Sequence, residues 1–108
     1  MALFMIQATY TPQAWAAMMK KPENRREAIR SMMEKSEWTL RDVYFCFGEY
    51  DVVVLYEAPD AIAGAAAAVA ANAAGHLKAI KTTQLLTVEE SMDIMRKAAA
   101  STLRVPGN

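Results

Sequence analysis

The chain has 108 residues, the size of one domain, and 54% of them are hydrophobic against 22% charged, which excludes intrinsic disorder. Twelve basic residues balance twelve acidic ones, so no net field attracts nucleic acid or an anionic membrane. Cys46 is the only cysteine, which excludes an internal disulfide.

The chain shows no targeting or membrane segment. The N-terminal residues lack the basic start and long apolar core of a signal peptide. The most apolar stretch, residues 62–74, is mostly alanine, too short and too weakly hydrophobic to cross a bilayer. We therefore predict a cytoplasmic protein that binds neither membrane nor nucleic acid.

The first third of the chain predicts a strand and two short helices. Residues 3–10 are apolar, with threonine and aromatic content typical of a strand. Thr11-Pro12 suits a helix start, because threonine caps free backbone N–H groups and proline needs no partner there. Pro22 then interrupts the helical pattern, and a second helix is expected over residues 22–35. One face of that helix carries Arg25, Ala28, Ile29, Met32 and Met33.

Two strands follow, over residues 38–47 and 51–57, joined by a hairpin turn at Gly48-Glu49-Tyr50. Three consecutive valines in the second strand favour burial because they are β-branched. Asp60 is positioned to cap the next helix.

The C-terminal third predicts a helix over residues 62–74, a strand over 76–86 and a helix over 88–99. Gly75 ends the first helix, since glycine tolerates a left-handed backbone. Thr87-Val88-Glu89-Glu90 fits a capping box before the last helix.

The order β-α-β-β-α-β predicts an α+β, ferredoxin-like sandwich with a four-stranded antiparallel sheet and an extra C-terminal helix. We expect one domain over residues 1–103 and a flexible tail over residues 104–108. The two middle strands carry apolar side chains at both odd and even positions, whereas a water-exposed face would alternate more cleanly. A second copy of the chain is therefore expected on the helix-free face, most simply in a two-fold dimer.

The stretch from Phe47 to Val54, Phe-Gly-Glu-Tyr-Asp-Val-Val-Val, followed by Glu57-Ala58-Pro59-Asp60, resembles the GYD domain family. The resemblance extends to Tyr10-Thr11-Pro12-Gln13 and Lys81-Thr82-Thr83 and covers nearly the whole chain except the tail. It implies a dimeric α/β barrel, in which two ferredoxin-like sheets face each other. The same turn is similar to the effector-binding domain of Lrp/AsnC regulators, which implies small-molecule sensing, although this chain has no helix-turn-helix segment.

Polar residues within apolar strands are predicted to line a cavity inside the barrel, because a buried polar group needs a partner. These are Gln7, Tyr44 and Glu57, each of which suits a solvated sheet edge equally well.

The turn adds three residues with two readings each. Gly48 serves the turn, where positive φ is cheap for glycine, or lies beside the ligand. Tyr50 contacts a ligand or packs against a partner subunit. Asp51 accepts hydrogen bonds from the turn backbone, binds a ligand amine or acts as a general base.

His76, the only histidine, follows a helix C-terminus. It interacts with the helix dipole or serves as an acid–base residue at the mouth of the barrel. No second ligand stands at metal-binding spacing, so no metal site is predicted. Cys46 is expected in mid-strand as a buried, inert thiol, with a nucleophile as the alternative role.

A basic run is interleaved with glutamates at three- and four-residue spacing, which predicts a self-paired, solvated helix face. Its members are Lys20, Lys21, Arg25, Arg26 and Arg30.

Three functions are compatible with these features. The preferred one is a ligand-binding domain whose homodimer encloses a small apolar molecule. The second is a cofactor-free enzyme of oxygenase or isomerase type that uses His76 and Asp51. The third is a purely structural assembly module. Binding is preferred because no acid–base pair lies at close spacing, and no cofactor is predicted because no phosphate loop or paired-cysteine motif is present.

Overall fold

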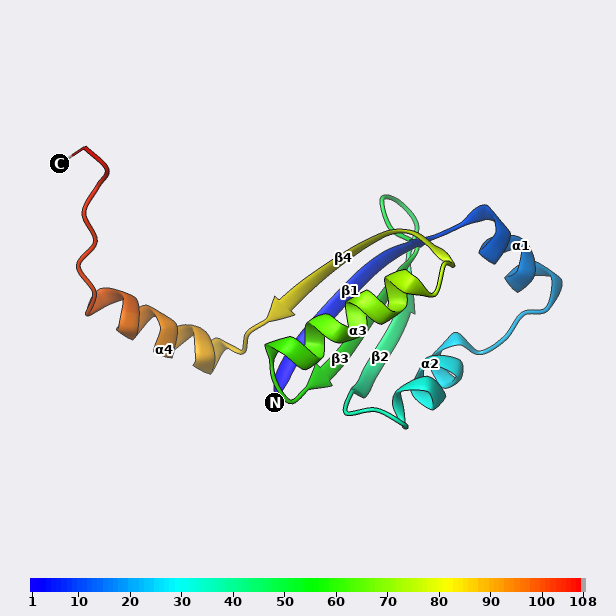
Figure 1. Ribbon diagram of the computed structural model, residues 1–108, viewed down its shortest axis with the longest axis horizontal. Helices are drawn as coiled ribbons and strands as arrows, with labels where there is room; N and C mark the ends of the chain where they lie inside the picture. The colour runs from blue at the N-terminus through cyan, green and yellow to red at the C-terminus, as the bar shows by residue number, and fades with distance from the viewer. Residues whose placement is uncertain (108) are drawn as a thin grey trace.

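The computed structural model describes residues 1–107. The elements in chain order are β1 (Ala2–Tyr10), α1 (Pro12–Lys20), α2 (Arg25–Met33), β2 (Thr39–Phe45), β3 (Val52–Ala58), α3 (Ala61–Ala73), β4 (Leu77–Leu85) and α4 (Val88–Ala99). The strands form one antiparallel sheet in the order β2-β3-β1-β4 (Figure 1). The predicted α+β class and four-stranded ferredoxin-like sheet are confirmed.

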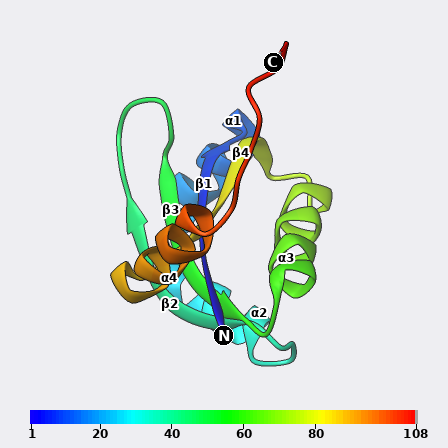
Figure 2. The same ribbon diagram turned by 90° about the vertical axis from the view of Figure 1, so that its left-hand side faces the viewer.

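Helices α2 and α3 cover one face of the sheet, and α3 stands beside that face in the end-on view (Figure 2). Side chains alternate along the two central strands, because successive residues of a strand point to opposite faces. The even-numbered positions form the core: Phe4, Ile6, Ala8 and Tyr10 on β1, and Val52, Val54, Tyr56 and Ala58 on β3.

The first half of α3 lies unusually close to the sheet. A Cβ atom at Gly64 would stand 2.2 Å from the ring of Phe4, so only glycine permits this approach. Two aromatic side chains form hydrogen bonds with the first turn of α3. The Tyr56 hydroxyl donates to the Gly64 carbonyl at 2.7 Å, and the Trp38 indole N–H donates to the Ala63 carbonyl at 2.7 Å. These contacts fix the N-terminal end of α3.

The helix caps largely follow the sequence. Thr11, Asp60 and Thr87 each accept from a backbone N–H of the first turn, and Thr87 and Glu90 form the predicted capping box. The start of α2 was predicted wrongly at residue 22. Asn24 caps this helix through its side chain, which accepts from the Glu27 N–H, so the helix begins after Asn24 rather than at the proline.

The β2–β3 connection is longer than the predicted hairpin turn. Strand β2 ends at Phe45 rather than residue 47, and the loop runs from Cys46 to Asp51. The Cys46 N–H donates to the Asp51 carbonyl at 2.8 Å, and the Asp51 N–H donates to the Ala8 carbonyl at 2.9 Å. The backbone at the two ends of this loop therefore forms hydrogen bonds within the loop and to β1. Phe47 is 93% exposed, and Cys46 is a half-buried loop residue rather than a mid-strand one.

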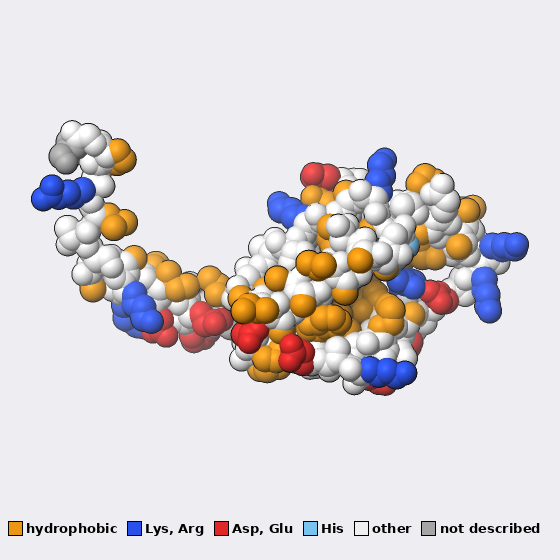
Figure 3. Space-filling model, viewed as in Figure 1, with side chains coloured by type: hydrophobic (Ala, Val, Ile, Leu, Met, Phe, Trp, Pro, Cys, Tyr) orange, Lys and Arg blue, Asp and Glu red, His pale blue; other side chains and the backbone are white. Residues whose placement is uncertain are grey.

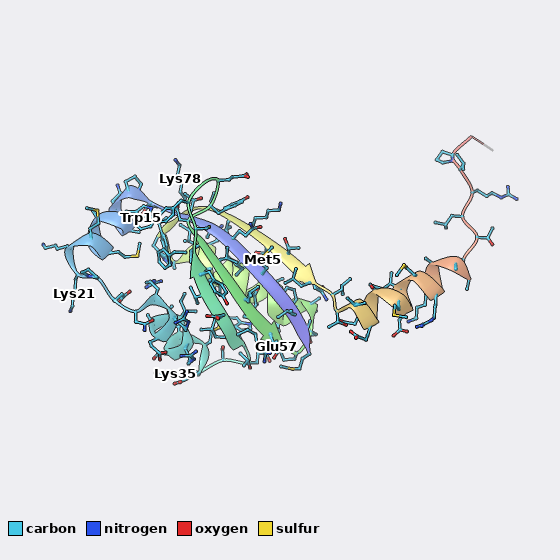
Figure 4. All side chains as sticks on the ribbon, turned by 180° about the vertical axis from the view of Figure 1, so that it is seen from behind. Met5, Trp15, Lys21, Lys35, Glu57 and Lys78 are labelled. Atoms are coloured by element: carbon cyan, nitrogen blue, oxygen red, sulfur yellow. The ribbon has the colours of Figure 1, made fainter. Side chains whose placement is uncertain are left out.

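The opposite face of the sheet, which we call the open sheet face, carries no helix (Figure 4). Its central side chains come from the odd positions of β1 and β3. Leu3, Met5, Val53 and Leu55 lie there, each half-buried by its neighbours.

Helix α4 projects away from the body of the domain beyond β4, and the molecule is 60 Å along its longest axis (Figure 1). No residue of α4 is buried, and Val88, Met92 and Met95 expose apolar side chains to solvent. Residues 101–107 continue without a helix or strand, and Asn108 of the predicted tail lies outside the described residues. Within residues 1–107, no helix is both long and apolar enough to cross a membrane.

Candidate ligand-binding site

A cavity of about 300 Å³ lies between the sheet and the two helices α2 and α3. Hydrophobic side chains gather in the hollow between these helices (Figure 3). The sheet contributes Ile6, Ala8, Tyr10, Val52, Val54 and Leu77; α2 contributes Arg25, Ile29, Met32 and Met33; α3 and its end contribute Ala67, Ala70, Ala71, Ala74 and His76, with Trp38 from the loop before β2.

The cavity follows from the small side chains of α3. Helix α2 packs against β2, while α3 packs over β4, β1 and β3, so the two helices stand on different strands. Alanine at positions 67, 70, 71 and 74 then leaves unfilled the space that larger side chains would occupy. Protein interiors are normally close-packed, so an apolar space of this size is a distinctive feature of the domain.

Three polar side chains meet at one end of the cavity. The Arg25 guanidinium carbon lies 6.0 Å from the Tyr10 ring centroid, within reach of a cation–π attraction. The rings of Tyr10 and His76 are stacked with centroids 6.0 Å apart. Tyr10 therefore joins the cation of α2 to the imidazole at the end of α3.

Arg25 forms an ion pair through one of its three nitrogens. Its side chain is 17% exposed, and Nη1 donates to Glu23 Oε1 at 2.6 Å. Its Nε–H is buried and has no hydrogen-bond partner within the described residues. Buried donors are nearly always paired in native proteins, so this N–H marks a place where an acceptor is missing.

His76 is neutral at physiological pH. Partial burial and the nearby positive charge of Arg25 both lower the pKa of His76 below its ordinary value of 6.5. The imidazole therefore offers one donor and one acceptor nitrogen, without a second positive charge. His76 lines the cavity as a residue at its end, and the predicted acid–base role stays a prediction.

Asp51 lies outside this cavity and holds the β2–β3 loop to the end of β1. Its Oδ2 accepts from the Tyr10 backbone N–H at 3.0 Å and from the Trp15 indole N–H at 3.2 Å. Gly48 has φ of +149°, a conformation that favours glycine. Tyr50 is half-buried in the same loop, and its carbonyl accepts from the Cys46 thiol. The loop thus has a structural task in the protomer.

Gln7 and Tyr44 lie on the open sheet face and do not line the cavity. The strand register places them in one row across the sheet, Tyr44–Val53–Gln7–Lys81. Glu57 points to the same side, where it lies 3.9 Å from Arg41 (Figure 4). A cavity between two facing sheets, which these residues were predicted to line, stays a prediction about the assembled protein.

Two important residues of the cavity were not predicted as site residues. Tyr10 was expected at the end of a strand and within the family resemblance, and Arg25 was assigned both to one face of its helix and to a solvated basic run. The available signal was the position of Arg25 on the apolar face of its helix, together with Ile29 and Met33. Within residues 1–107, no group of three or more histidine, cysteine or acidic side chains is arranged to hold a metal ion.

The GYD domain family model matches residues 4–95 of the chain. No curated protein sequence matches it significantly. Among solved structures, MtbAldR is similar in fold, with a TM-score of 0.59 and 19% sequence identity, over 80% of this chain and 53% of that chain. The chain therefore spans about half the length of MtbAldR, and at this identity the likeness concerns the fold alone.

Proposed function

We propose that this chain, which belongs to the GYD domain family, is a binding module for a small and largely apolar molecule. The observation that carries the proposal is the cavity of about 300 Å³ between the sheet and helices α2 and α3. Small-molecule sites typically measure roughly 300–1,000 Å³ and combine apolar walls with a few convergent polar groups. Tyr10, Arg25 and His76 supply such groups at one end.

Binding is favoured over catalysis by the separation of the two candidate acid–base residues. His76 lines the cavity. The Asp51 carboxylate instead accepts from Tyr10 and Trp15, which belong to the β1–α1 junction. A general base needs to reach the proton that it removes. Of the two acid–base residues that the enzyme hypothesis uses, His76 and Asp51, only His76 lines the cavity.

The proposed working form is a homodimer that joins two open sheet faces. Leu3, Met5, Val53 and Leu55 form an apolar surface there, and no helix or strand within residues 1–107 covers it. A contiguous apolar patch on one sheet face is typical of a protein–protein contact. A two-fold axis would pair the patch with itself and leave the cavity of each protomer on the outer, helical side.

The binding proposal is tested with 1-octanol, a neutral probe, in titrations that follow the methyl NMR signals of Ile29 and Met33. Saturable shifts are expected in the wild type. Ala71→Phe fills the cavity from α3 and is expected to weaken binding at least tenfold. Ala66→Phe is the matched control, because Ala66 is exposed on the same helix and does not line the cavity. Equal binding by both variants would contradict the proposal.

The assembly proposal is tested by light scattering after size-exclusion chromatography. The wild type is expected to have the mass of a dimer. Leu55→Glu introduces a charge on the open sheet face and is expected to give a folded monomer, whereas Ala65→Glu on the exposed side of α3 leaves the dimer intact. A monomeric wild type would overturn this part of the proposal.

A further inference from the structure

The ligand class follows from the way Arg25 sits at the cavity, and this inference rests on the proposed function. Every other lining residue is apolar or uncharged at neutral pH, with Tyr10 and the neutral His76 as the polar ones. Arg25 is the single cation among them. A ligand that fits both features has an apolar body and one negative charge at one end.

The guanidinium is only partly satisfied within the chain. Nη1 of Arg25 pairs with Glu23 Oε1 at 2.6 Å. This side of the guanidinium faces solvent, because the Glu23 side chain is 49% exposed. The Nε–H is buried and has no partner within residues 1–107. A guanidinium binds a carboxylate through two parallel N–H donors. Because Nε has almost no accessible surface, the Arg25 side chain must turn toward the cavity to present these donors to an anion, which would then supply the acceptor that residues 1–107 do not provide.

The surroundings favour a carboxylate over a larger or more highly charged anion. Arg25 carries one positive charge and already shares it with Glu23, which leaves less than one unit for a ligand to balance. No second cation lines the cavity, whereas sites for phosphate groups usually gather several donors and charges. The guanidinium, which lies over the Tyr10 ring at 6.0 Å, is itself planar and suits a planar partner.

We propose that the cavity binds an apolar monocarboxylic acid, with its hydrocarbon part between α2, α3 and the sheet and its carboxylate paired with Arg25. The hydrocarbon part is the portion that a neutral probe would already recognise. The carboxylate adds selectivity. Glu23 competes with the ligand for the same guanidinium and so lowers the affinity.

The test compares octanoate with 1-octanol by isothermal titration calorimetry on the full chain. The wild type is expected to bind octanoate at least about tenfold more tightly than 1-octanol, as one charge-assisted pair provides. Arg25→Gln is expected to remove that preference, so that octanoate and 1-octanol bind the variant with similar affinity. Arg25→Lys keeps the charge without the planar fork and is expected to retain part of the preference.

Two further variants separate this pairing from a general charge effect. Glu23→Gln removes the competing carboxylate and is expected to raise octanoate affinity several-fold. Arg26→Gln is the matched control, because Arg26 is exposed on the same helix and pairs with Asp42 at 2.8 Å; it is expected to leave both affinities unchanged.

The outcomes distinguish the two proposals. If 1-octanol binds but octanoate shows no advantage, or if Arg25→Gln leaves the preference intact, the ligand class is wrong and the binding module stands. If neither probe binds the wild type, the proposed function fails and the ligand class fails with it.

Discussion

Asp51 gives the sharpest test of whether the GYD turn is structural. Its carboxylate accepts two hydrogen bonds, from the Tyr10 N–H and the Trp15 indole, at 3.0 and 3.2 Å. A hydrogen bond to a charged group contributes about 1.5–3 kcal/mol when buried. Both bonds here are only part-buried, so we expect Asp51→Ala to lower the free energy of unfolding by about 2–3 kcal/mol in total.

The assay is urea denaturation at one fixed protein concentration, because the stability of the proposed dimer would depend on concentration. With a slope of about 1–3 kcal/mol per molar urea, the midpoint falls by roughly 1 M or more. Asp51→Asn keeps one acceptor oxygen without the charge, so about half of the loss is expected. Glu49→Ala, in the same exposed loop, is the control. An Asp51→Ala protein within about 0.5 kcal/mol of the wild type would refute the structural reading and return Asp51 to the ligand-binding candidates.

Three further predictions follow from the core and from His76. Gly64→Ala is expected to destabilise the fold by about 1–3 kcal/mol in urea denaturation, because the new Cβ would meet the Phe4 ring at 2.2 Å. Adding Phe4→Leu is expected to restore part of this loss. An unchanged urea midpoint for Gly64→Ala would argue against the close approach of α3 to the sheet. Tyr56→Phe is expected to cost about 1 kcal/mol by removing the bond to Gly64. Burial raises the pKa of Tyr56 to about 12, so an ultraviolet titration should show fewer late-ionising tyrosines in the variant than in the wild type. Because the pKa of His76 is lowered in the fold from 6.5, the neutral imidazole contributes to the free energy of unfolding above that pH, and this contribution is lost as pH falls further. His76→Gln should therefore flatten the loss of stability on acidification. An unchanged pH profile would contradict the neutral, partly buried imidazole.

The sheet and the helix caps could be predicted from the sequence because their signals are local. Alternation in β1 and β3 and the β-branched valines place the strands. Thr11, Asp60 and Thr87 each mark a helix start through a hydrogen bond that spans three residues. The longer β2–β3 loop was missed because it is held by the contacts of Asp51 with β1 and α1, some forty residues earlier in the chain.

The cavity could not be predicted, because it depends on which strands the two helices cover. The alanines of α3 were visible in the sequence, but alanine is equally suited to close helix packing. Only the lateral separation of α2 and α3 turns Ala67 and Ala71 into cavity walls. Arg25 was assigned to the solvated charges for a related reason: it stands in a basic run interleaved with glutamates. Its actual partner, Glu23, is only two residues away, and the burial of its Nε depends on the tertiary position of α2.

The central claim, that a ligand lies between the sheet and the helices, is tested most directly by intermolecular nuclear Overhauser effects from the alkyl protons of bound octanoate. The cavity predicts contacts with the methyl groups of Ala71 and Met33, which line it. Contacts with Met5 and Leu55 instead would place the ligand on the open sheet face, between two protomers, and would contradict the site described for this domain.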